Sequence, residues 1–310
     1  MPTFRFRRTP VSARLGATLL AAAASLALGS APRMAAAQDT IPAARPIPAD
    51  SLVDVRLTDG SRLMGRIVED SGDRLVLVTA SGARVELQRA QIASMTRAAG
   101  TVVRGEFREE DPNSSRLYFT ATGRSIPKGQ AYFGVYELFF PFVSYGVTDR
   151  FTISGGTPVV PEAMGKLAYV APKFQVIRGP NTNVSVGGLV FFGDFEGAAG
   201  VAYGVGTFGS NDNAFTVGAG WGFERSGGHG DLANEPLVVL GGESRIGAHT
   251  KFISENYLVP GGVGLLSGGV RFFSGNLSAD AGLFGAVGDG NVGCCLPMVN
   301  FVYVFGRPKK

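Results

Sequence analysis

From residue 111 to the C-terminus, apolar side chains alternate with small or polar ones in runs separated by Gly, Asn, Asp or Pro. In the run 213–224, for example, Phe215, Val217, Trp221 and Phe223 alternate with Gly and Thr. A period of two places one set of side chains on each face of a sheet. The pattern predicts twelve strands with almost no helix between them, at 115–122, 131–146, 149–157, 166–178, 183–194, 199–209, 213–224, 235–246, 249–259, 264–274, 277–287 and 298–306.

The lengths of these runs favour a membrane barrel. They exceed the ~5–6 residues of a common soluble strand and match the ~9–11 residues with which a tilted strand crosses a bilayer. The face opposite the apolar one carries Gly, Ser, Thr and scattered charges, as a polar lumen would. We therefore expect an all-β protein whose residues 111–310 form an antiparallel up-and-down transmembrane β-barrel of about 12 strands. Because a soluble two-sheet sandwich also has one apolar face, a periplasmic protein that binds a ligand or glycan between two sheets stays open as an alternative.

The alternation assigns side chains to the two faces of the barrel. Charged residues are costly on the lipid side, by roughly 2–4 kcal/mol for Arg or Lys at mid-depth, so they are expected to face the lumen. The candidate lumen-facing residues are Glu243, Arg245, Lys251, Glu255, Arg271 and Asp280. The candidate lipid-facing residues are Phe215, Val217, Trp221, Phe301, Tyr303 and Phe305. Such a lumen either conducts small solutes or is plugged by paired charges, and its expected width lies between those of 8-stranded barrels and 16-stranded porins.

The segment 116–156 resembles uncharacterised outer-membrane β-barrel proteins of environmental bacteria, and 251–262 and 298–306 extend the resemblance over most of 111–306. The C-terminal alternation of Phe301, Tyr303 and Phe305 is also similar to the strand signal that the outer-membrane assembly machinery reads, although five residues follow it. These resemblances imply a location in the bacterial outer membrane, contacts with its lipid and with the barrel assembly machinery, and no particular reaction.

A second alternating region precedes the barrel. Residues 52–58, 61–69, 74–80 and 83–87 alternate, with turns at Asp59-Gly60, 70–73 and Ser81-Gly82, and a helical turn near Arg89 leads to a last strand near 93–97. The residues Val55, Leu57, Asp59, Gly60, Gly65 and Ile67 match the opening of Sm-like or SH3-like small barrels. We therefore expect a small β-barrel module at 51–100. Because no Phe, Tyr or Trp lies between residues 50 and 106, nucleic acid is not an expected ligand, and a docking or spacer role in the periplasm with a possible partner there is preferred.

The first fifty residues indicate export. Residues 1–37 combine an Arg-rich start, an uncharged Leu/Ala run and small residues at 35–37, which is typical of a cleaved signal peptide, and the Pro-containing stretch 38–50 reads as a linker. Five of the 29 Lys and Arg lie in 1–37, so 24 remain against 25 Asp and Glu, a net charge of −1. The basic isoelectric point therefore belongs to the targeting segment and implies no basic binding surface.

Little in the sequence points to chemistry. The chain has two His and two Cys, which excludes most metal sites, and no G-x-S-x-G motif occurs. An outer-membrane lipid hydrolase would require His229, in an expected loop, or His249 to lie beside a Ser in the folded barrel. The adjacent Cys294 and Cys295 could form a vicinal disulfide or remain free. We expect no catalytic residue, cofactor or metal, and a function that is structural or consists of passive passage of small solutes.

Overall fold

The computed structural model describes residues 52–306 apart from 99, 162–163, 195–196, 227–228, 261, 263 and 289–290. The expected signal peptide and linker lie outside the described residues. Among the described residues, no helix is both long and apolar enough to span a membrane.

The N-terminal region is a five-stranded antiparallel sheet in the order β4-β3-β2-β1-β5. Its strands are β1 (Leu52–Leu57), β2 (Arg62–Asp70), β3 (Arg74–Thr79), β4 (Arg84–Gln88) and β5 (Ile92–Arg97), and the 3-10 turn η1 (Arg89–Gln91) precedes the last strand. These bounds agree with the sequence pattern to within a few residues. The sheet buries one apolar cluster, made of Val53, Val55, Ile67, Leu75, Leu77 and Leu87.

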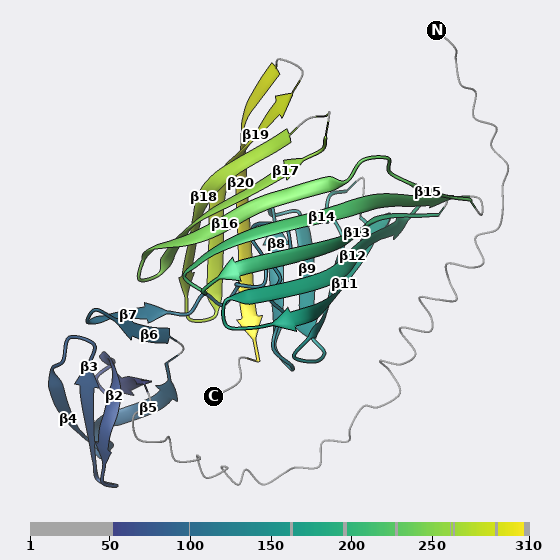
Figure 1. The fold of residues 1–310 in the computed structure, drawn as a ribbon. Coiled ribbons are helices and arrows are strands. Elements are labelled where there is room, and N and C mark those ends of the chain that lie inside the picture. Colours follow the sequence, from purple (N-terminus) through teal and green to yellow (C-terminus); the bar gives the residue numbers. More distant parts are fainter. Residues whose placement is uncertain are drawn as a thin grey trace, which may run out of the picture. The chain divides into compact units, whose positions relative to one another are not determined.

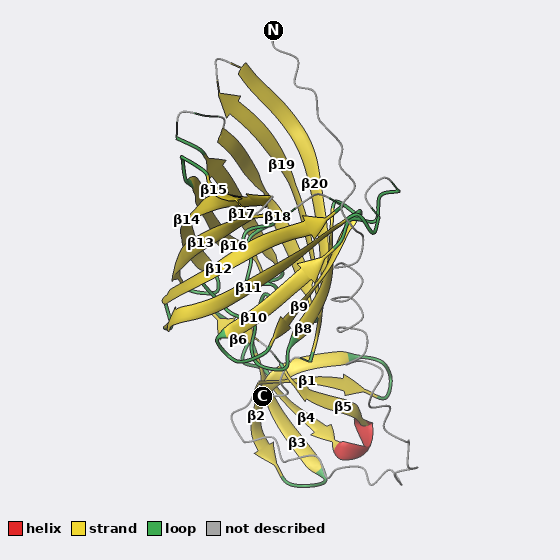
Figure 2. Ribbon diagram, turned by 90° about the vertical axis from the view of Figure 1, so that its right-hand side faces the viewer, coloured by secondary structure: helices red, strands yellow, loops and turns green. Residues whose placement is uncertain are grey.

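A short hairpin follows, formed by β6 (Gly100–Val103) and β7 (Glu106–Glu109). The remaining strands form one large antiparallel sheet (Figures 1 and 2). They are β8 (Ala131–Tyr136), β9 (Phe140–Gly146), β10 (Phe151–Gly156), β11 (Leu167–Arg178), β12 (Thr182–Gly193), β13 (Ala198–Gly209), β14 (Asn213–Ser226), β15 (His229–Leu232), β16 (Leu237–Gly247), β17 (Thr250–Leu258), β18 (Gly264–Ser274), β19 (Leu277–Gly288) and β20 (Asn291–Phe305).

This sheet closes into a barrel. Its thirteen described strands run from β13 through β8, β20 and β16 to β14 and β15, and an additional pairing joins β13 to β14. Since β15 pairs only with β14, twelve of the described strands form the closed wall. The expected all-β barrel is therefore confirmed. Because the described wall strands form one continuous closed sheet, they are not arranged as a sandwich of two packed sheets.

Two strand predictions were wrong. One predicted strand is absent from the wall and another is two strands, so the total of twelve is unchanged. Residues 115–122 do not join the wall, and only an isolated bridge between Arg116 and Ala121 forms there. Residues 131–146 are not one strand but the hairpin β8–β9, whose turn places Glu137 and Leu138 at φ 49° and 62°. Positive φ at two bulky residues is uncommon, and the sequence lacks the Asn-Gly or Asp-Gly that usually marks such a turn.

Smaller differences concern the ends of the strands. The segment around His229 was expected to be a loop but forms β15, which pairs with the end of β14. The last strand begins at Asn291 instead of 298 and is fifteen residues long. Every other strand of the wall begins and ends within a few residues of its predicted position.

In the barrel the usual distribution of side chains is reversed, with polar groups inside and apolar groups outside. Charged and polar side chains on its strands are buried, including those of Lys173, Glu243, Lys251, Glu255 and Arg271. Large apolar side chains cover its outer surface, among them Phe133, Val143, Phe174, Phe215, Trp221, Phe252, Phe272, Leu283, Phe301 and Tyr303. The two sets alternate along each strand, as period-two patterning requires.

Candidate functional site

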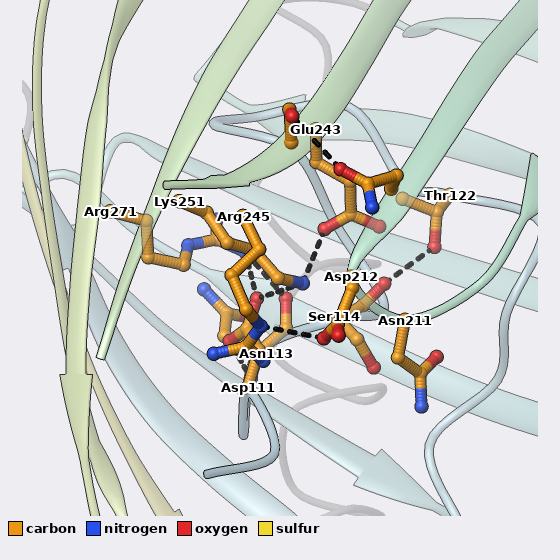
Figure 3. A network of polar contacts seen from close by, with 12 residues as sticks. Asp111, Asn113, Ser114, Thr122, Asn211, Asp212, Glu243, Arg245, Lys251 and Arg271 are labelled. Atoms are coloured by element: carbon orange, nitrogen blue, oxygen red, sulfur yellow. Dashed lines mark hydrogen bonds and ion pairs between the residues drawn. The ribbon is translucent and has the colours of Figure 1, made fainter. Parts of the chain in front are cut away.

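The lumen contains a segment of the chain itself. Residues 111–130, which we call the plug, connect the hairpin β6–β7 to the first wall strand and run through the barrel interior. Their buried members are Asp111, Pro112, Asn113, Ser115, Arg116, Leu117, Tyr118, Thr122, Gly123, Arg124, Ile126 and Gln130. Its contacts with the strands are mainly polar, as Figure 3 shows for one part of the network.

Arg271 on β18 is the main attachment point of the plug. Its guanidinium bonds both oxygens of Asp280 on the neighbouring strand at 2.6 and 3.0 Å. The same group reaches Asp111 Oδ2 at 3.3 Å and donates to the backbone carbonyls of Asn113 at 2.9 Å and Arg116 at 3.2 Å. It also donates to the carbonyl of Leu117. One fully buried side chain therefore ties four plug residues to the wall, since five donors in a fixed fork suit such a cluster.

A second set of charges links β16 and β17 to the plug. Lys251 Nζ lies 3.0 Å from Asp111 Oδ2 and 2.7 Å from Glu243 Oε2. The other oxygen of Glu243 accepts from Arg124, which also donates to the carbonyl of Ser210 at 2.7 Å. Together with Arg271 and Asp280, these residues balance three acids against three bases, which satisfies the requirement that buried charges be paired.

Glu255 binds the tip of the plug, a tight turn in which Leu117 N donates to Thr120 O at 2.9 Å. Its carboxylate accepts from the backbone N–H groups of Tyr118 at 2.7 Å, Phe119 at 3.1 Å and Thr120 at 3.1 Å. The hydroxyl of Tyr257 donates to the same carboxylate. Donors from a turn that converge on one carboxylate form charge-assisted bonds, which fix both the depth and the direction of the tip.

The opposite side of the plug is held by two further cations. Lys173 on β11 donates to the carbonyls of Ser115, Thr122 and Arg124, at 3.2, 3.1 and 2.6 Å. The guanidinium of Arg116, on the plug itself, lies 4.1 Å from the ring centroid of Phe142. It is also close to the rings of Tyr132 and Tyr136, so that aromatic faces surround this charge.

Glycines in the wall make room for the plug tip. A Cβ on Gly241 would lie 2.4 Å from Leu117 Cδ1, and one on Gly269 would lie 2.8 Å from the Tyr118 hydroxyl. Both distances are too short for a real side chain. The small residues that alternate with apolar ones in the sequence thus include positions that accommodate an internal segment.

The plug begins at the end of the barrel where the strands are joined by short turns. Arg245 Nε contacts Asp212 Oδ1 at 2.6 Å, and its other nitrogens reach the carbonyl of Glu109 at 2.8 Å and that of Ala248 at 2.9 Å. Glu109 accepts from the backbone of Gly275 at 2.6 Å and lies 3.0 Å from His249 Nδ1. These contacts hold the chain at the rim just before it turns into the lumen.

The same rim bears on the hydrolase alternative. His249 contacts the carboxylate of Glu109 and the ring of Phe273, and in the described part of the chain no Ser hydroxyl bonds its imidazole. The side chain of His229 lies outside the described residues. Within the residues that the structure describes, no three His, Cys, Asp or Glu side chains gather as a metal site would require.

Beyond the plug tip the lumen changes character. Phe119 at the tip is about one-third exposed and packs against Tyr136 and Phe284, with ring centroids 5.0 and 5.8 Å apart. Above it, a cavity of about 260 Å³ is lined by Leu265, Phe284, Gly285, Ala286, Gly293 and Leu296. We call this apolar cavity the upper chamber. A second hollow, of about 490 Å³, lies at β12–β15 and is lined by Phe191 and Val201 but also by Glu224 and Asp231.

The structure places the predicted site residues as follows. Five of the lumen-facing candidates point into the barrel and meet around the plug, namely Glu243, Lys251, Glu255, Arg271 and Asp280. The sixth, Arg245, is buried at the rim, where it contacts Asp212 and Glu109. Phe215, Trp221, Phe301, Tyr303 and Phe305 are exposed on the outer surface, and Val217 is half-buried there. Cys295 is disulfide-bonded, while the side chain of Cys294 lies outside the described residues.

Sequence reasoning missed the plug residues themselves. Asp111, Arg116 and Arg124 stood in what was interpreted as a turn and a first strand, and Lys173 was not singled out on its strand. Charge matching gave no signal, because the lumen-facing candidates comprise three acids and three bases and are balanced without additional partners. The absence of clean alternation across 111–130, which holds Pro112 and Pro127, was the better clue.

Comparison with known proteins adds a general likeness. No family model matches the chain, and no curated protein matches it in sequence. Among solved structures, the KdgM porin in complex with disordered oligogalacturonate is 8% identical, with 57% of this chain and 98% of that chain covered at a TM-score of 0.42. A loop-deletion mutant of OmpT, an outer membrane protein of Vibrio cholerae, is 13% identical, with 82% and 96% covered at 0.33. OccAB4 of Acinetobacter baumannii is 8% identical, with 84% and 69% covered at 0.30.

Proposed function

We propose that this protein is a bacterial outer-membrane β-barrel in which the plug, residues 111–130, closes one half of the lumen, so that any passage of small solutes is slow and limited by the plug. The observation that carries the proposal is the distribution of side chains on the wall. The closed sheet exposes Phe215, Trp221 and Phe301 and buries Lys251 and Arg271. That arrangement is unfavourable in water and favourable in lipid, because an outward apolar band is what a bilayer solvates.

The plug favours a largely closed barrel over an open pore. The three acid–base pairs around Arg271, Lys251 and Arg124 leave the polar half of the lumen filled with protein. In a 12-stranded barrel the lumen is narrow enough for one such segment to fill it. A structural role and a restricted, passive passage both agree with this geometry.

The topology also suggests an orientation. Ala131 at the start of the first wall strand pairs with Phe305 at the end of the last, so the chain enters and leaves at the same end of the barrel. In bacterial barrels the short turns and the termini face the periplasm. The N-terminal sheet, with its own buried core, would then be a periplasmic module of the Sm-like or SH3-like type that docks a partner or acts as a spacer.

The test is fractionation of the expressed full chain, with gel mobility compared before and after boiling. We expect recovery in the outer membrane and a heat-shifted band. Planar-bilayer recordings of the purified protein should then show a conductance well below that of an open porin. Recovery in the soluble periplasm without detergent would contradict the proposal, and a large steady conductance would contradict the closed lumen.

A further inference from the structure

Three neighbouring strands of the wall are too short to cross a bilayer. β8, β9 and β10 have six, seven and six residues, whereas the other strands of the closed wall have nine to fifteen. At about 3.4 Å per residue and a tilt of about 40°, six residues rise about 16 Å, against an apolar band of about 25 Å. The wall over β8–β10 therefore ends partway through the membrane.

The missing length lies at the end away from the termini. β8 pairs with β20 only from Ala131↔Phe305 to Tyr136↔Asn300, and Glu137 N then bonds Val299 O at 2.9 Å. In the described part of the chain, residues 291–298 of β20 pair with β19 and have no strand on their other side. In Figure 1 the ends of β19 and β20 extend well past β8 and β9.

The free edge carries a residue that suits an unpaired position. The carbonyl of Val299 faces β8, and backbone groups of alternate residues face the same side, so Pro297 also faces the free edge. Proline has no N–H to donate and is confined within sheets to edges and bulges. A further strand that paired with this edge would find one backbone N–H donor fewer. The edge is therefore better explained as a permanent gap than as a docking site for another chain.

The surroundings of the gap are apolar on both sides. At its lower lip, Leu138, Phe139 and Phe140 are about half exposed. Inside, the upper chamber beside β19 and β20 is lined by Leu265, Phe284, Ala286 and Leu296. The charged half of the lumen is separated from this space by the plug tip and its exposed Phe119.

We propose that the low wall over β8–β10 is a lateral opening, through which an apolar, chain-like molecule moves between the outer leaflet and the upper chamber. This inference rests on the proposed membrane barrel and names the class of its solute. A polar solute would meet an apolar chamber and a sealed plug, whereas a hydrocarbon chain meets apolar surface from the bilayer to the chamber floor. Apolar lining of this kind selects apolar ligands by the area it removes from water.

The experiment uses the full chain in phosphatidylcholine liposomes and a photoreactive diazirine-bearing alkane, with adducts mapped by mass spectrometry. We expect labelling of the outer surface at Leu283 and Phe301 and, in addition, of Leu265 and Leu296 in the chamber. Ala286→Trp, which fills the chamber, should reduce labelling of Leu265 and Leu296 and leave Phe301 unchanged. Labelling confined to the outer surface would overturn the lateral opening, whereas an unlabelled outer surface would overturn the membrane barrel as well.

A second set of variants changes the lower lip of the gap. The double variant Leu138→Asp/Phe139→Asp should reduce chamber labelling severalfold, because each carboxylate would have to be crossed by the apolar probe. Leu277→Asp is the matched control, since Leu277 is also an exposed apolar residue but lies at the start of β19, away from the gap. Chamber labelling that is equal in all these variants would mean entry through the mouth of the barrel and would overturn the proposal.

Discussion

The N-terminal sheet and the barrel are built from the same kind of alternating strand and use it in opposite senses. The sheet buries Val53, Val55 and Leu75 and keeps its ion pairs, such as Arg74–Glu69, near the surface. The barrel buries ion pairs such as Arg271–Asp280 and exposes aromatic residues such as Phe215 and Trp221. The alternation is identical in form, and the two regions differ in whether the apolar or the polar face of the strand is buried. Substitutions that place a side chain of the wrong kind on one of these faces test the difference.

The largest effect is expected from Arg271→Met. The substitution removes the cation between Asp280 and Asp111 and the donor to three plug carbonyls. Breaking a buried pair in this way costs about 3–5 kcal/mol, because the remaining charge is left uncompensated. We expect a lower urea midpoint of the barrel in liposomes and new tryptic cleavage after Arg116 or Arg124. Arg178→Met, at an exposed arginine of the same barrel, is the control and should change neither.

The mirror-image change in the N-terminal sheet is Leu75→Ala. Leu75 is fully buried in the apolar cluster, so its truncation should destabilise the sheet by about 2–5 kcal/mol. Amide hydrogen exchange of residues 52–97, measured in the full chain, should accelerate while that of the barrel strands stays the same. Val68→Ala, at a side chain that is 47% exposed, should change little. Equal acceleration in both variants would contradict the assignment of the core.

On the outer surface the informative change is Phe301→Lys. If lipid solvates this face, a cation near mid-depth costs about 2–4 kcal/mol, whereas Phe301→Leu keeps the face apolar. The measurement is the fraction of protein that folds into liposomes, read from its heat-shifted gel band across a urea series. A Lys variant as stable as the Leu variant would show that water, not lipid, contacts Phe301.

Period-two alternation was sufficient to predict most of the wall because each strand has an apolar outward face and a polar face toward the lumen. It located β11–β14 and β16–β19 nearly to the residue and placed Glu243, Lys251, Glu255 and Arg271 on the buried face. It failed for 115–122, where apolar residues such as Leu117 and Tyr118 are buried inside the barrel against the wall. Alternation reports that a side chain is covered on one face and does not report by what.

The upper chamber and the low wall over β8–β10 could not be predicted from the sequence, for a related reason. Both depend on register, which sets how far one strand rises past its neighbour, and single-strand patterns carry no information about register. The turn at Glu137 and Leu138 fixes the height of β8 and β9, yet neither residue is a usual turn former. Tertiary contacts, including the bond of Glu137 N to Val299 O, hold that turn in place.

The smallest effect is expected from lowering the pH. Burial alone would raise the pKa of Asp111, but the attraction of Lys251 and then of Arg271, together with a backbone bond from Asn113, holds this pKa well below its ordinary value of 3.8. A carboxylate with a lowered folded-state pKa contributes stability that is complete above the ordinary pKa and is lost only as the pH falls through the lowered one. The difference in thermal midpoint between the unmodified protein and Asp111→Asn should therefore stay constant from pH 8 to about pH 4. The midpoint of Asp111→Asn should be the lower one throughout, because the attraction of Lys251 and Arg271 for the carboxylate is lost. A difference that shrinks above pH 4 would show that Asp111 is not held by Lys251 and Arg271, and the plug would then be attached mainly through Glu255 and Lys173.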